Sequence, residues 1–352
     1  MITITAAVTM PKTPTMKDVA KATGVSVMTV SRAFKQDASV SAVTRDQIRA
    51  AAEDMGYVFD SMAANLRSQR SGFIAVTVPT IDNANFADTV GALSARLEIA
   101  GLQVLLGYTN YDINKEEHLV EQLLRRRPEA IVVTGGAHTD RTRRLLAKSG
   151  IPVVETWDLP PTPIGHVVGF SNQAALESVV DHMVAKGFSR IAFIGGDAEN
   201  DTRGADRRRG FVAAMHRHGL DASRLIGGGL PPISMQKGAV AMSHLLDRLP
   251  DTQAVICVSD LSAFGALTEC MRRSIKVPDQ MAIAGFGAYE ISDVSVPAIT
   301  TIDPFPRKIG LLTAELIISL LTDDLVSHAK KIIAIEPKVI QRQSTGPSAA
   351  RQ

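Results

Sequence analysis

The stretch MKDVAKATGVSVMTVSRAF, residues 16–34, decides the first part of the fold. Thr15 and Asp18 match a helix N-cap followed by an acid at the third helical position, and Gly24 ends the helix that they begin. Ser26 then caps a second helix, in which apolar residues recur at spacings of three and four. Two short helices joined by a glycine-containing turn are typical of a helix-turn-helix, whose second helix enters the major groove of DNA.

A third helix follows in VSAVTRDQIRAAAEDMGY, residues 40–57. It begins near Thr44, carries Ile48 and Ala52 on its apolar face, and ends at Gly56. The pattern predicts a three-helix DNA-binding domain over residues 15–59, preceded by a flexible leader over residues 1–14. Spacing alone leaves one alternative, a three-helix unit that contacts another protein.

The whole chain has 352 residues, of which 45% are hydrophobic and 21% are charged. These values are ordinary for a soluble globular protein and exclude a disordered chain, a collagen-like fibre and a disulfide scaffold. The formal net charge is +2, but the first 70 residues carry +3 and the remainder −1, which weakly favours a polyanionic partner. No apolar run approaches the roughly 20 residues that span a bilayer. With no signal peptide at the N-terminus, we expect a cytoplasmic protein with no membrane partner.

From Phe73 onward, short apolar strands alternate with helical stretches, which predicts an α/β fold of parallel sheets covered by helices on both faces. Strands are expected at residues 73–78, 103–109, 130–135, 152–157, 190–196, 254–260 and 281–287. This segment of about 270 residues is longer than a single doubly wound domain usually is, so we expect two subdomains. The proline-rich stretch at residues 159–165 is expected to carry the chain to the second sheet, and a second crossing is expected near residues 295–304.

Ligands of open parallel sheets bind beyond the carboxyl ends of the strands, so two facing sheets would line one cleft. Carboxylates, amides, an arginine and the single Trp follow these strand ends, which suits a polyhydroxylated ligand. The side chains expected there are Asp82, Asn83, Phe86, Trp157, Asp158, Asp197, Arg203, Asp260 and Glu290. No P-loop, G-x-S-x-G or dinucleotide-binding motif is present, so we expect neither an enzyme nor a cofactor. Cys257 and Cys270 have no nearby His pair and indicate buried thiols rather than a metal site.

The two helical segments closely resemble the DNA-binding domain of the lactose/galactose repressor (LacI/GalR) family of transcriptional regulators, through the pattern D-V-A-x-x-x-G-V-S-x-x-T-V-S-R. The resemblance implies base contacts by Val27, Met28 and Arg32. It implies phosphate or backbone contacts by Thr29, Ser31, Thr15, Ser41, Thr44 and Tyr57. Arg32 fits this role because its guanidinium can bond O6 and N7 of guanine bidentately.

Residues 60–68, DSMAANLRS, contain good helix formers and neither Pro nor Gly. A helix of this length is marginal alone in water. The resemblance implies a hinge helix over residues 60–70 that orders on DNA and places Ala63 and Leu66 in the minor groove. Leu66 would then open a central base step. A plain linker is the alternative.

The body, residues 71–342, also resembles this family, whose regulatory domain is similar to periplasmic sugar-binding proteins. The landmarks are GIPVVE, GFSNQAAL, GFSRIAFIGG, CVSDLSAFGAL and VPDQMAIAGFG. The resemblance implies effector contacts at Phe86, Trp157, Asp158, Arg203, Arg207, Asp260 and Glu290. Gly287 stands where many members have Asp, which weakens the expectation of a neutral sugar. The stretches TECMRRSIKVPDQMAIAGF and VVGFSN resemble the gluconate-operon type, and Arg203 suits the carboxylate of a sugar acid.

These observations together predict a repressor that binds a pseudo-palindromic double-stranded DNA operator as a homodimer. Its operator affinity would be controlled by a sugar acid such as gluconate, bound between the two subdomains. The alternatives are the same regulator responding to a neutral sugar or a purine, and a pure solute-binding protein, which leaves residues 15–66 unexplained. Residues 343–352 are polar and lack heptads, which predicts a flexible tail and favours a dimer over a tetramer.

Overall fold

A computed structural model of the protein describes residues 13–34, 39–59, 71–322 and 329–346. The chain divides between Ser71 and Gly72 into two units. The predicted hinge helix at residues 60–70 and the predicted leader up to residue 12 lie outside the described residues.

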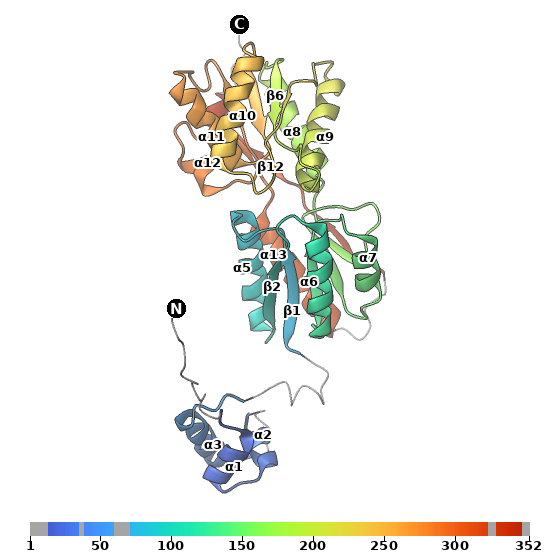
Figure 1. Ribbon diagram of the computed structural model, residues 1–352, viewed down its shortest axis with the longest axis vertical. Helices are drawn as coiled ribbons and strands as arrows, with labels where there is room; N and C mark the ends of the chain where they lie inside the picture. Colours follow the sequence, from blue (N-terminus) through green and yellow to red (C-terminus); the bar gives the residue numbers. More distant parts are fainter. Residues whose placement is uncertain (1–12, 35–38, 60–70, 323–328, 347–352) are drawn as a thin grey trace, which may run out of the picture. The chain divides into compact units, whose positions relative to one another are not determined.

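The N-terminal unit consists of α1 (Met16–Thr23), α2 (Val27–Phe34) and α3 (Ala42–Asp54) (Figure 1). Thr15 and Asp18 form the predicted capping box, and Gly24 ends α1 in the left-handed region at φ +69°. Helix α3 begins at Ala42, two residues before the predicted start near Thr44, and Ser41 caps it, because its hydroxyl accepts the Thr44 N–H at 3.2 Å. The three helices bury one small apolar core, made of Val19, Ala20, Val30, Ala33, Val40, Ile48 and Ala52.

The second unit begins with a six-stranded parallel sheet in the order β11-β5-β4-β3-β1-β2. Its strands are β1 (Phe73–Val78), β2 (Gln103–Tyr108), β3 (Ala130–Thr134), β4 (Val153–Thr156), β5 (His166–Gly169) and β11 (Ile332–Ala334). Its helices are α5 (Ala84–Ile99), α6 (Ile113–Arg125), α7 (Asp140–Ala147) and α13 (Pro306–Thr322), of which α13 packs along α5 (Figure 1). We call this part the first lobe.

The second lobe contains a four-stranded parallel sheet in the order β7-β6-β8-β9. Its strands are β6 (Ile191–Ile194), β7 (Leu225–Ile226), β8 (Ala254–Cys257) and β9 (Ala282–Ala284). Its helices are α8 (Asn172–Ala185), α9 (Thr202–Arg217), α10 (Met235–Arg248), α11 (Asp260–Arg272) and α12 (Glu290–Val294). The pairs α8 with α9 and α10 with α11 pack together (Figure 1). Each of the seven predicted strands is present in one of the two sheets.

The predicted crossing at residues 159–165 is wrong. This proline-rich loop joins β4 to β5, which pair in parallel within the first sheet, and the chain enters the second lobe only after β5. The loop composition marks an irregular segment but carries no information on which sheet receives the next strand. The return follows β10 (Thr301–Asp303), at the end of the predicted stretch 295–304, because α13 lies in the first lobe.

A third crossing was not predicted. After β11, in the first sheet, β12 (Lys338–Ile340) pairs antiparallel with β10. Part of the predicted flexible tail is ordered, since a 3₁₀ helix, η1 (Gln343–Thr345), follows. Ser344 is fully buried there, and its hydroxyl donates to the carbonyl of Ile283 at 2.6 Å. The tail boundary at residue 343 is therefore wrong.

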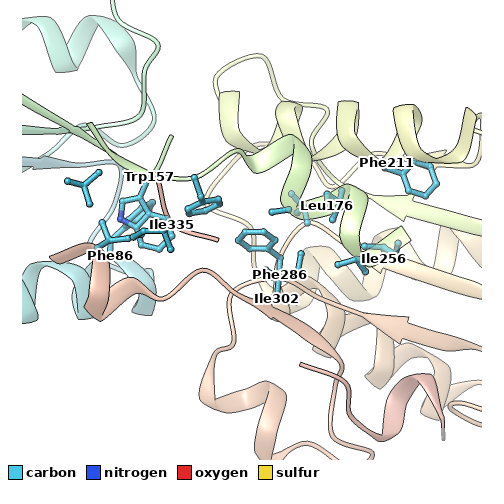
Figure 2. Packing of buried hydrophobic residues seen from close by; sticks show 14 of the residues in the cluster. Phe86, Trp157, Leu176, Phe211, Ile256, Phe286, Ile302 and Ile335 are labelled. Carbon is cyan, nitrogen blue, oxygen red and sulfur yellow. The ribbon is translucent and has the colours of Figure 1, made fainter. Parts of the chain in front are cut away.

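One apolar core runs through both lobes. Figure 2 shows its side chains passing from Phe86 and Trp157 to Phe286 and on to Leu176, Ile256 and Phe211. Ring contacts link Phe86 to Trp157 at 5.2 Å, Trp157 to Phe170 at 5.9 Å and Phe170 to Phe286 at 6.1 Å between centroids. We call these four rings the aromatic row. It ties the strand ends of the two lobes together where the chain crosses between them.

Candidate functional site

Helix α2 presents one mixed apolar and basic face. Val27 and Met28 are 41% and 50% exposed, and Arg32 is also exposed, whereas Val30 and Ala33 on the opposite face are fully buried. Thr29 and Ser31 are half-buried. The apolar spacing thus fixes which side of α2 packs and leaves the three predicted base-reading side chains accessible.

Most of the other residues predicted to contact the DNA backbone lie at or near helix ends. The Thr15 hydroxyl donates to Asp18 Oδ2 at 2.6 Å at the start of α1, and Ser41 caps α3 through Thr44. Backbone N–H groups at helix N-termini attract phosphate oxygens. Tyr57 packs its ring edge-on to Phe34, with the ring centroids 6.0 Å apart. Ala63 and Leu66 lie outside the described residues.

The second unit contains a cavity of about 680 Å³, its open mouth included, at the carboxyl ends of strands from both lobes. We call it the main cavity. Four of the predicted effector contacts meet there, namely Phe86, Trp157, Arg203 and Arg207. The rest of the lining is Thr80, Asp82, Asn83, Asn85, Tyr111, Asp201, Pro232, Ile233, Val258, Ser259, Leu261, Phe286 and Tyr289.

Two guanidinium groups dominate its chemistry. Arg203 and Arg207 lie one turn apart on α9. Arg207 donates from Nε to Asn172 Oδ1 at 3.0 Å and from Nη1 to the Val258 carbonyl at 2.9 Å, and burial lowers its pKa to about 10. Arg203 is only 7% exposed. Neither guanidinium forms an ion pair within the described part of the chain. The cavity also contains the carboxylates of Asp82 and Asp201, but the two unpaired guanidinium groups can bind an anion.

Each guanidinium also contacts one end of the aromatic row. Arg207 lies 3.5 Å over the ring of Phe286, and Arg203 lies 5.6 Å from the centroid of Phe86. Trp157 is 2% exposed, and two edge-on ring contacts hold it within the row. It therefore does not offer the open indole face that a sugar-covering residue would need.

Three predicted effector contacts lie outside the lining of the main cavity. Asp158 lines a separate surface groove and accepts the Leu159 N–H. Asp260 is fully buried, where Oδ1 accepts the Thr301 hydroxyl at 2.6 Å and Oδ2 accepts the Tyr289 N–H at 2.8 Å. Burial raises the pKa of Asp260 to about 6. Glu290 is exposed at the start of α12. Asp197, which was expected in the cleft, accepts the Gly228 N–H with Oδ1 and does not line the cavity.

Sequence reasoning missed several lining residues. Tyr111 follows β2, so the strand-end rule applied to that strand would have found it. Tyr289 donates its hydroxyl to Asn83 Oδ1 at 2.9 Å and so joins the two lobes across the cavity. Asn83, like Asp82, lines the cavity as predicted, but no sequence signal marks its contact with Tyr289, because the two residues meet only through the fold.

Comparison with known proteins agrees with this architecture. Residues 15–60 match the family described as bacterial regulatory proteins, lacI family, and residues 180–345 match the periplasmic binding protein-like domain. The chain is 35% identical over 332 residues to the HTH-type transcriptional regulator GntR of Pseudomonas aeruginosa, covering 94% of this chain and 96% of that protein. This chain belongs to the LacI family. It is a DNA-binding transcriptional regulator, and its relatives are regulators rather than enzymes, as the sequence predicts.

Further similarities cover most of this LacI-family chain. It is 30% identical to the regulator GntR of Escherichia coli strain K12, covering 90% of this chain and 94% of that protein. A LacI-family regulator of Silicibacter pomeroyi of known structure is 31% identical with a TM-score of 0.87, covering 95% of this chain and all of that one. Among the described residues, no group of three His, Cys, Asp or Glu side chains could hold a metal ion. Nor is any described helix long and apolar enough to cross a membrane.

Proposed function

We propose that this regulator is a repressor whose operator affinity is controlled by a sugar acid, of the gluconate type, bound in the main cavity. The observation that carries the proposal is the pair Arg203 and Arg207, two guanidinium groups that line the cavity and form no ion pair in the described part of the chain. A carboxylate pairs with such a fork bidentately. Asn and Tyr side chains beside the pair supply hydrogen bonds for hydroxyl groups.

The effector contacts of this proposal are Arg203 and Arg207 for the carboxylate and Phe86 with Trp157 as the apolar wall. Two subunits pair so that two α2 helices reach successive major grooves about one helical turn apart on a pseudo-palindromic operator. The effector acts only through its different affinity for the DNA-competent and DNA-incompetent arrangements of the two lobes.

A thermal-melt screen of the full chain against gluconate, neutral sugars and purines tests the effector class. A ligand at about a hundred times its dissociation constant stabilises the protein by roughly 2.7 kcal/mol. We expect a raised midpoint with gluconate or a keto-gluconate. A shift with neutral sugars or purines alone would refute the sugar-acid proposal and support the alternative effector class.

Titration of the operator tests the DNA contacts separately. Replacing Arg32 by Ala should cost about 1–3 kcal/mol of operator binding and relax the base preference at one position of each half-site. Val43→Ala is the matched control, because this residue is 69% exposed on α3 and is not among the proposed DNA contacts. An unchanged operator affinity and base preference in Arg32→Ala would remove Arg32 from the interface.

A further inference from the structure

A second cavity adjoins the main one. It has a volume of about 590 Å³ with its mouth included, and we call it the side pocket. Tyr111 and Arg203 line both cavities, so these two side chains stand between them. The other side-pocket residues are Pro79, Thr109, Asp112, Ile113, Glu116, Thr134, Gly135, Ala137, Glu199, Asn200 and Thr202.

The backbone places Tyr111 and Arg203 at this boundary. Asn110 and Tyr111 both have positive φ, at +54° and +59°, a conformation that costs an ordinary residue roughly 1 kcal/mol or more and that recurs at ligand-binding positions. Gly135, in the first lobe, has φ +96°, and a Cβ there would lie 2.9 Å from Arg203 Nη1. The glycine thus leaves room for the guanidinium to reach the side pocket from α9.

The two cavities differ in charge. The main cavity has both arginines and two carboxylates, those of Asp82 and Asp201, whereas the side pocket has Arg203 alone and three carboxylates, those of Asp112, Glu116 and Glu199. Glu116 is 5% exposed, and its Oε2 lies 2.8 Å from His138 Nδ1, which fixes the carboxylate in the pocket wall. Carboxylates accept hydrogen bonds from hydroxyl groups and repel anions.

We infer that the effector is a polyhydroxy acid with one anionic end. Its carboxylate binds between Arg203 and Arg207, and its hydroxylated end passes Tyr111 into the side pocket. A second anionic group on that end, either a carboxylate or a phosphate ester, is excluded by Asp112, Glu116 and Glu199. The inference rests on the proposed sugar-acid function and adds the orientation of the ligand and the class of acids that the site rejects.

Calorimetric titration of the full chain compares gluconate with glucarate, which carries a carboxylate at each end, and with gluconate esterified by phosphate at the far end. We expect both dianions to bind at least about tenfold more weakly than gluconate, which corresponds to about 1.4 kcal/mol. Equal affinity for gluconate and glucarate would overturn this inference while leaving the proposed function intact. Binding of no sugar acid at all would overturn the proposed function and this inference with it.

Variants of side-pocket residues test whether this pocket causes the weaker binding of dianions. Glu116→Gln and Glu199→Gln should each raise glucarate affinity more than gluconate affinity, and Glu199 is exposed, so its variant should fold normally. Glu98→Gln, an exposed acid at the end of α5 and outside both cavities, is the control. Ala137→Leu narrows the side pocket and should weaken the binding of gluconate more than the binding of the shorter acid threonate. Unchanged affinity ratios in all three side-pocket variants would overturn the inference.

Discussion

Replacing Arg203 by Met should have two effects of opposite sign. The Arg203 side chain is only 7% exposed and forms no ion pair among the described residues. An uncompensated charge in such a place opposes folding. Methionine keeps an unbranched apolar stem and removes the charge, so the protein without ligand should become more stable. The same substitution removes half of the proposed carboxylate site, so the response to gluconate should shrink.

The magnitudes follow from the environment of the side chain. Complete burial of an unpaired charge costs several kcal/mol, but this guanidinium faces a cavity with an open mouth. We therefore expect a gain of about 1 kcal/mol, or roughly 2–4 °C in the melting midpoint. Charge-assisted hydrogen bonds contribute about 1.5–3 kcal/mol, so gluconate should bind roughly ten- to a hundredfold more weakly. A stabilisation of about 2.7 kcal/mol by gluconate would fall to between about 0.4 and 1.4 kcal/mol.

Melting curves with and without gluconate measure both effects on one sample. Arg209→Met is the matched control, since Arg209 lies on the same helix, its side chain is 65% exposed, and it pairs with Asp206 at the surface. It should leave the gluconate response unchanged. If Arg203→Met melts no higher than the parent protein and still responds fully to gluconate, Arg203 is neither an unpaired buried charge nor a ligand contact.

Three further predictions address the other parts of the chain. Leu66→Ser should weaken operator binding and leave gluconate binding intact, measured by operator and ligand titrations; unchanged operator affinity would refute the wedge expected from the family resemblance. Ile48→Ala removes a fully buried side chain from the small helical core and should cost about 2–5 kcal/mol, which abolishes DNA binding while the gluconate-dependent melt persists. Burial raises the pKa of Asp260 to about 6 from 3.8, so the folded protein favours the protonated carboxyl. The stability that this group contributes is therefore full below about pH 4 and is lost as the pH rises through about 6. The free energy of unfolding should fall by about 2 kcal/mol between about pH 4 and pH 7. Asp260→Asn should flatten the free energy of unfolding over that range, and an unchanged slope would show that another group titrates there.

The sequence predicted the helical unit well because each of its signals is local. Thr15, Ser26 and Gly24 act within one turn of the helix that they begin or end, and the apolar spacing of α2 fixes its buried side. The longer strands of the body were equally visible as apolar runs. Strands β5, β7 and β10 to β12 were missed because they have only two to four residues each and, unlike the equally short β6, β8 and β9, do not lie within a longer apolar run.

Chain crossings and site geometry depend on contacts between distant residues. Nothing in residues 159–165 distinguishes a loop within one sheet from a passage between two, since the pairing of β4 with β5 decides it. The strand-end rule placed Asp260 at the correct edge of the sheet. It could not predict that the Thr301 hydroxyl and the Tyr289 N–H would hold the carboxylate inside the second lobe. Those two partners lie 41 and 29 residues away in sequence.

If the proposed sugar acid binds the two arginines, their position provides a way for ligand charge to act on the arrangement of the lobes. Both come from α9 in the second lobe, yet Arg203 contacts Phe86 of the first lobe and Arg207 contacts Phe286 of the second. Asn172 strengthens this link, because its amide donates to the Trp157 carbonyl while its oxygen accepts from Arg207 Nε. We therefore expect a carboxylate bound to both guanidinium groups to bind best in the arrangement of the lobes in which Arg203 contacts Phe86. Since a ligand shifts a conformational equilibrium only through such a difference in affinity, an effector that lacks the anionic group should bind more weakly and also lose most of its effect on operator binding.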